Sequence, residues 1–186
     1  MAEESIKPVH GHSFFTLDYS GRFAQILVFD YYDPERYYYG LLHDEERYRS
    51  AMNGLLASMN ELLGEEEVKV NGEVVHPEAL TVNLDFRGEA EKPAITFYIE
   101  FEGSLNPGGE NIYECRYEPG AVEYDYESYW FFPSGSRILE VVTDTDYEVY
   151  GERFLVFWAR RGDRYGGYEM IRFRLPFLGR RGPGSP

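Results

Sequence analysis

Carboxylates alternate with aromatic and small side chains along residues 121–132, which read AVEYDYESYWFF. Successive side chains of an extended strand point to opposite faces, so Glu123, Asp125 and Glu127 are expected to share one face. Carboxylates that are held close together can separate their pKa values and act as an acid–base pair. This face therefore makes a carboxylate-dependent hydrolase one candidate function.

The preceding segment, residues 112–118, is expected to pair with this strand through a turn at Pro119-Gly120. That register would place Glu114 opposite Asp125, so that the acidic cluster comprises four side chains. Its predicted members are Glu114, Glu123, Asp125 and Glu127. A solvated or arginine-paired face is the alternative interpretation, and the expected partners are Arg116, Arg172 and Arg174.

The opposite face of the same strand is aromatic and carries Tyr124, Tyr126 and Trp130. A buried hydroxyl without a partner costs on the order of 1–3 kcal/mol, so a packed core would normally use phenylalanine at these tyrosine positions. We therefore predict a cavity for a small apolar or aromatic ligand, although the same rings could also fill a dry core. The residues predicted to bind this ligand are Tyr124, Tyr126, Trp130, Phe97, Phe101, Met52 and Met59.

Five tyrosines crowd residues 30–40, a segment in which Pro34 and Gly40 interrupt regular structure. A tyrosine-rich loop suits recognition, because each ring offers a large contact area and a polar tip at a low entropic cost. A protein–protein interaction module that uses this loop and an exposed edge strand is thus an alternative function. The tyrosines of the predicted interaction loop are Tyr31, Tyr32, Tyr37, Tyr38 and Tyr39.

Three further features could carry metal or thiol chemistry, and each has a simpler interpretation. His10 and His12 would lie on the same side of a strand, but no third metal ligand is fixed by their spacing. Asp144 and Asp146 fit ordinary turn chemistry in a hairpin loop. Cys115 is the only cysteine, and it is expected to be an inert core thiol. The sequence therefore predicts no metal site and no cofactor.

The composition limits the classes of partner. The chain has 186 residues and a formal net charge of −15, whereas nucleic acids and anionic membrane surfaces attract basic proteins. It contains no run of 18 apolar residues and does not begin like a signal peptide, so we predict a cytoplasmic protein. The single glutamine, Gln25, and the many Glu, Arg and Tyr residues are typical of thermophiles. The oligomeric state is left open.

One long helix is predicted over residues 44–63, where apolar side chains recur at helical spacing. Asp44 is the expected N-cap, and Gly64 is the expected end of the helix. Met52, Leu55, Met59 and Leu62 should face a sheet, whereas Asn60 should lie on the opposite, exposed side.

Two strands are expected before this helix and about eight or nine after it, linked by short turns, which predicts a mainly β fold. Asn71-Gly72 marks a hairpin over residues 68–75, and residues 79–87 and 94–102 should form an antiparallel pair. We expect an antiparallel meander that closes into a barrel or a strongly curved half-barrel, with the helix packed on it; the alternative is a two-sheet sandwich with an edge helix. Residues 13–178 would form this single domain, between flexible segments at 1–12 and 179–186.

Overall fold

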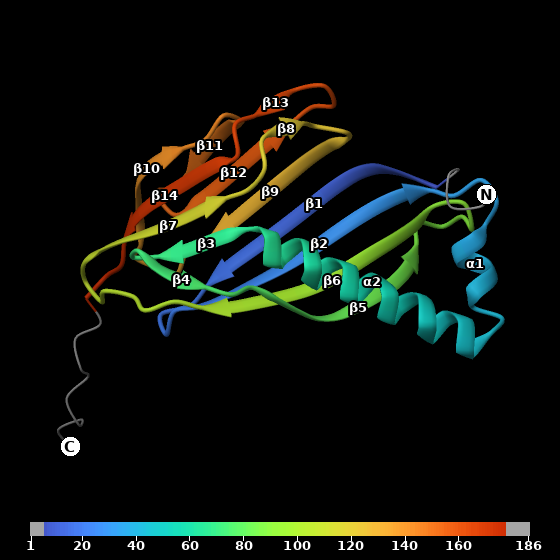
Figure 1. Cartoon of the computed structure of the whole chain (residues 1–186). Coiled ribbons are helices and arrows are strands. Elements are labelled where there is room, and N and C mark those ends of the chain that lie inside the picture. Colours follow the sequence, from blue (N-terminus) through green and yellow to red (C-terminus); the bar gives the residue numbers. More distant parts are fainter. Residues whose placement is uncertain (1–5, 178–186) are drawn as a thin grey trace, which may run out of the picture.

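The computed structural model describes residues 6–177 and contains two main β-sheets and one long helix (Figure 1). The seven-stranded sheet has the spatial order β11 (Asp146–Tyr150), β12 (Phe154–Ala159), β9 (Asp125–Phe131), β1 (Lys7–Leu17), β2 (Arg22–Tyr32), β6 (Pro93–Glu102) and β5 (Glu78–Phe86). The five-stranded sheet has the order β10 (Arg137–Val142), β14 (Tyr168–Arg174), β7 (Glu110–Arg116), β3 (Glu67–Val70) and β4 (Glu73–Val75). The short strands β8 (Gly120–Ala121) and β13 (Arg164–Tyr165) form a separate pair.

The mainly β class is confirmed, but the described strands do not close into a barrel, and the two-sheet alternative fits the structure better. The simple meander is also wrong, because β9 lies between β1 and β12 and runs parallel to β1. Parallel neighbours cannot be joined by a tight turn. The chain therefore leaves the large sheet after β6, builds part of the small sheet and returns.

The long helix α2 (Glu45–Glu65) begins as predicted, since the Asp44 side chain accepts a hydrogen bond from the backbone N–H of Arg47. It continues through Gly64, so the predicted end at that glycine is wrong. A short helix, α1 (Tyr37–Leu41), precedes it where the sequence predicted a loop. The buried side chains of α2 are Met52 and Met59, whereas Leu62 is exposed.

Two different elements cover the inner face of the seven-stranded sheet (Figure 1). Helix α2 lies against β5, β6 and β2, where Met59 packs in a cluster with Ile95 and Phe97. The five-stranded sheet lies over the other part, where Phe23 and Leu155 share a second cluster with Ile171. Each cover buries apolar side chains of the large sheet, which is the usual way in which layers of secondary structure are stabilised. The two hydrophobic clusters meet at the end of α2.

Two predicted strand pairs are confirmed, with one change of side-chain direction. Asn71 and Gly72 have φ angles of 52° and 82°, as the turn of the β3–β4 hairpin requires. Strands β5 and β6 pair antiparallel, but a register shift between Ala79 and Thr81 interrupts the alternation. Ala79 is consequently buried, and Leu80, which was expected to face inward, is 50% exposed.

The segment 121–132 is not one continuous strand. Residues 120–121 belong to β8, and the long strand β9 begins only at Asp125. The predicted hairpin with residues 112–118 is wrong, because β7 pairs with β14 and β3 in the other sheet. The predicted arm at residues 1–12 also differs from the structure, in which β1 starts at Lys7. Residues 1–5 and the predicted tail at 179–186 lie outside the described part of the chain.

The outer face of the seven-stranded sheet carries an apolar row that sequence reasoning missed. Cross-strand registers align Val156, Tyr129, Phe14, Ile26 and Tyr98 across five neighbouring strands. Phe14, Ile26 and Tyr98 are exposed. A near-continuous apolar sequence such as that of β2 is typical of a strand covered on both faces, but Ile26 is exposed on its outer face.

Asn60 links α2 to the edge strand β5, contrary to the expected exposed position. Its side-chain amide donates to the backbone oxygen of Ala79 at 3.1 Å and accepts from the backbone N–H of Ala79 at 2.8 Å. We expect Asn60→Ala to lower the free energy of unfolding by roughly 1–3 kcal/mol, because it leaves two half-buried backbone groups without these partners. Asn53→Ala, at an exposed position of the same helix, is the control for chemical denaturation. Equal effects of the two substitutions would contradict this role of Asn60.

Candidate functional site

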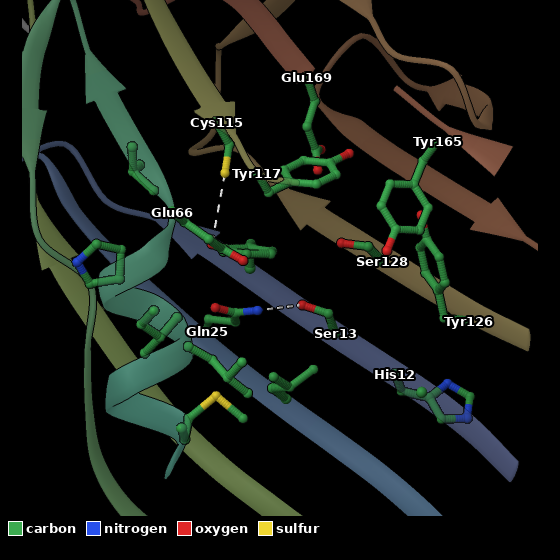
Figure 2. Close-up of a pocket in the computed structure, with 18 of the residues that line it drawn as sticks. His12, Ser13, Gln25, Glu66, Cys115, Tyr117, Tyr126, Ser128, Tyr165 and Glu169 are labelled. Atoms are coloured by element: carbon green, nitrogen blue, oxygen red, sulfur yellow. Dashed lines mark hydrogen bonds between the residues drawn. The ribbon is translucent and has the colours of Figure 1, made fainter. Parts of the chain in front are cut away.

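A cavity of about 580 Å³ lies where the two covers of the large sheet meet. Its walls come from the inner face of β1, β2 and β9, from the C-terminal end of α2, and from β7 and β14 of the small sheet (Figure 2). Apolar side chains such as Leu27, Met59 and Phe101 line it together with polar ones. Neither α2 nor the small sheet covers this part of the large sheet completely, so the cavity is a direct result of the two-cover architecture.

Two glutamates and a tyrosine are gathered at one end of the cavity, as Figure 2 shows. Glu66 is the C-cap residue of α2, and its carboxylate lies 3.8 Å from the Cys115 sulfur. Glu169 comes from β14 and shares a hydrogen bond with the Tyr117 hydroxyl. The cavity thus has an acidic end that is built from three separate elements.

The environment of these two glutamates disfavours their charged forms. Glu66 is exposed and Glu169 is half-buried, and both line the cavity beside apolar side chains. Desolvation, reinforced by the negative charge of Glu66, raises the pKa of Glu169 to about 7. Desolvation also raises the pKa of Glu66 above its ordinary value. A carboxyl with such a pKa changes its charge near neutral pH, where a bound ligand can control its ionisation.

Cys115 and Tyr113 line the same cavity from β7. Burial, followed by the nearby negative charges, strongly raises the pKa of the Cys115 thiol and of the Tyr113 hydroxyl. A nucleophilic cysteine needs a lowered pKa, so Cys115 remains a protonated thiol at neutral pH. The predicted core position of Cys115 is confirmed, since it belongs to the buried core.

Polar side chains also line the cavity beyond this acidic end. Gln25 donates to the Ser13 hydroxyl at 2.9 Å, and Figure 2 shows Ser128, Tyr126 and Tyr165 on the side away from Glu66. Burial raises the pKa of Tyr126 to about 12, so its hydroxyl remains a hydrogen-bond donor at neutral pH. These groups could orient a ligand without adding charge.

Gly11 of β1 determines how closely a ring can approach the cavity wall. A Cβ atom at this position would lie 3.2 Å from Cε2 of Tyr124. Glycine therefore allows the Tyr124 ring to rest against β1, where it lines the cavity. Burial raises the pKa of Tyr124 to about 12, so this hydroxyl also remains protonated.

Trp130 lines the cavity and is almost fully buried. Its ring stacks on Phe15 with centroids 3.9 Å apart. The indole N–H has no hydrogen-bond acceptor among the described residues. An unpaired buried donor costs on the order of 1–3 kcal/mol. A ligand that placed an acceptor near this N–H would therefore bind more tightly.

The structure brings most of the predicted ligand-binding residues to this cavity. Those that line it are Tyr124, Tyr126, Trp130, Phe101 and Met59. Phe97 and Met52 instead pack in the cluster between α2 and the large sheet. Sequence reasoning missed Glu66 and Glu169, because each lies at the end of an expected element and no motif connects them. The only available signal was a glutamate, Glu169, beside apolar residues in a strand that otherwise carries arginines.

The predicted acidic cluster does not assemble. Glu114 lies on β7 of the small sheet, where it accepts a hydrogen bond from Tyr168. Asp125 binds the Arg160 side chain at 3.1 Å, and Glu127 accepts from the Tyr129 hydroxyl at 2.5 Å. Glu123 lines the cavity, and so does Glu127. The four carboxylates therefore do not form one cluster.

The predicted arginine partners are also different. Arg172 and Arg174 bind Glu110, Arg172 additionally binds Glu140, and Arg116 lies 4.0 Å from Glu67. None of these contacts involves the acidic residues of β9, because the arginines belong to β7 and β14 of the small sheet.

The histidine and aspartate pairs form no metal centre in the described part of the chain. The rings of His10 and His12 stack with centroids 4.2 Å apart, and His12 lies 3.9 Å from Glu127. Asp144 accepts a hydrogen bond from the backbone N–H of Gly166, so it stabilises a loop. Within residues 6–177, no group of three His, Cys, Asp or Glu side chains is arranged to hold a metal ion.

The tyrosine-rich segment is mostly ordered secondary structure. Tyr31 and Tyr32 end β2, and the other three tyrosines form α1. Tyr38 is buried, and Tyr31 and Tyr37 pack against the cluster beneath α2. Tyr32 and Tyr39 are exposed. An interaction surface at this segment remains a prediction, and these two exposed rings could contribute to it.

Comparisons with known proteins leave the family undefined. No family model matches the sequence, and no curated protein matches it. Among solved structures, native leukotriene A4 hydrolase from Saccharomyces cerevisiae is 8% identical over 91% of this chain and 29% of its own, with a TM-score of 0.37. An M1 zinc metallopeptidase from Deinococcus radiodurans is 8% identical over 90% of this chain and 42% of its own, with a TM-score of 0.38. The chain spans less than half the length of these proteins, and likeness at this level supports no conclusion about function.

Within residues 6–177, no helix is both long enough and apolar enough to cross a membrane.

Proposed function

We propose that this protein is a non-enzymatic binding protein for a small ligand with a largely apolar body. The observation that carries the proposal is the cavity of about 580 Å³ between the large sheet and its two covers. This volume falls within the range of small-molecule sites, which combine apolar walls with a few polar groups. The absence of an assembled acid–base pair on β9 favours binding over the carboxylate-dependent hydrolase.

A neutral apolar dye can test the cavity directly. We expect N-phenyl-1-naphthylamine to become fluorescent with the native protein, because its rings would leave water for the aromatic walls. Ser128→Phe would place a large side chain in the cavity and should weaken dye binding at least ten-fold, by the loss of roughly 1.4 kcal/mol or more. Ser50→Phe, at an exposed position of α2, should leave the affinity unchanged.

Circular dichroism and the thermal midpoint would establish that both variants are folded. No fluorescence change with the native protein, or equal binding by folded Ser128→Phe, would contradict the proposal.

The interaction module is the second candidate, and the exposed apolar row on the outer face of the large sheet favours it. Large exposed apolar surfaces often mark contacts with other proteins. If the dye does not bind, this alternative becomes the better account of the molecule. A cytoplasmic location, the absence of nucleic-acid partners and the thermophile-like character stay predictions from composition.

A further inference from the structure

The charged residues that line the cavity all have the same sign. Six glutamates contribute to its walls, and none of the described lining residues is a lysine or an arginine. These glutamates are Glu65, Glu66, Glu118, Glu123, Glu127 and Glu169. The whole chain has a formal net charge of −15. A concave site lined by one sign of charge attracts ligands of the opposite sign and repels those of the same sign.

The end of α2 adds to this negative potential. Helix α2 has 21 residues, and its C-terminus, where unpaired carbonyl groups give a partial negative charge, meets the cavity at Glu66. The last turn contains no basic residue that would compensate the dipole. Carboxylates at a helix C-terminus are unfavourable, so a cation bound at this end would be stabilising.

Aromatic rings surround the same space. Five tyrosines line the cavity in addition to Trp130, and they are Tyr113, Tyr117, Tyr124, Tyr126 and Tyr165. The faces of aromatic rings carry partial negative charge and attract organic cations, quaternary ammonium groups above all. The buried Trp130 N–H, which lacks an acceptor among residues 6–177, is an independent sign that a ligand completes this site, and it would pair with an acceptor on the ligand body rather than with the cationic group.

We propose that the ligand is an organic cation, with a protonated amine or a quaternary ammonium group between Glu66 and Glu169 and an apolar body against the aromatic walls. This inference rests on the proposed binding function and specifies the class of ligand. A bare metal ion fits less well, because the walls are mainly aromatic and aliphatic and no three-ligand group exists among the described residues. The raised pKa of both carboxyls agrees with a site in which a cation is needed to favour their charged forms.

A matched pair of probes isolates the charge from the shape. Benzyltrimethylammonium and neopentylbenzene have nearly the same shape, but only the first is charged. Both would compete with bound N-phenyl-1-naphthylamine at pH 8. We expect the cation to bind at least ten-fold more tightly than its neutral counterpart. The double variant Glu66→Gln/Glu169→Gln should reduce this ratio to about two or less, while neopentylbenzene binds as before.

The control is Glu61→Gln/Glu78→Gln, which removes two exposed glutamates outside the cavity wall and changes the net charge equally. It should retain the preference for the cation, so a loss there would mean that only the overall charge matters and would overturn the inference. Equal affinity of the two probes for the native protein would overturn it as well, while leaving the binding function intact. A failure of the dye to bind at all would instead contradict the binding function itself.

Discussion

Phe173→Ala should lower the free energy of unfolding by roughly 3–5 kcal/mol, the usual cost of truncating a fully buried phenylalanine. Phe173 is 0% exposed on β14, and its ring lies 4.7 Å from that of Phe132, which directly follows β9. The pair therefore joins the small sheet to the large one. Removing one ring leaves a void between the two layers that neither sheet can close alone, because each is fixed by its own hydrogen bonds.

Phe177→Ala is the matched control for this substitution, since the same residue type is 80% exposed four positions later. Its effect should stay within about 0.5 kcal/mol, as for most surface substitutions. Chemical denaturation of both variants measures the difference. Comparable losses would show that the contact between the two sheets contributes little to stability.

Glu169→Gln should stabilise the protein at pH 8 by about 3 kcal/mol, the free-energy equivalent of the rise in the Glu169 pKa, and have almost no effect near pH 4. The pKa of Glu169 rises from 4.5 in the unfolded chain to about 7 in the fold. Between these values the folded protein holds more protons than the unfolded chain, so its stability falls as pH increases and levels off above about 7. Glutamine has the shape of the protonated carboxyl but does not titrate, and it therefore avoids this loss.

Glu118→Gln controls for a change of charge at the same cavity, because Glu118 is exposed on its wall. Its effect should be small and nearly independent of pH. Urea denaturation from pH 4 to pH 8 compares the two variants. If Glu169→Gln destabilised the protein at pH 8, the carboxylate would be the favoured form, and the acidic end of the cavity would have to be interpreted differently.

Local structure was largely predictable from the sequence, whereas the arrangement of the strands was not. Asp44 as an N-cap and Asn71-Gly72 as a hairpin turn are decided by interactions within a few residues, so their sequence signals are reliable. The assignment of β9 beside β1 depends on contacts between residues more than 100 positions apart, such as Gly11 and Tyr126. No local pattern encodes that choice.

For the candidate site too, the residues within one strand could be predicted, whereas the contacts between distant elements could not. Tyr124, Tyr126 and Trp130 were recognisable because their alternation within one strand places them on one face. Glu66 and Glu169 come together only after α2 and β14 are packed on the large sheet, so their proximity could not be inferred before the topology was known. A glutamate within a strand gives no sign of its partner, and its unusual pKa arises from burial rather than from its neighbours in sequence.

The position of β9 between β1 and β12 also has a consequence for the order in which the chain can fold. Strands β1, β2, β5 and β6 with α2 are complete by residue 102, and these strands can pair with one another before β9 is made. The β1 edge that receives β9 must then wait until residues 125–131 emerge, since the parallel pair closes a loop of more than 100 residues. Such distant pairing slows folding and leaves a strand edge open during synthesis. We therefore expect a slow final phase in refolding, in which β9 joins β1 and the two sheets come together.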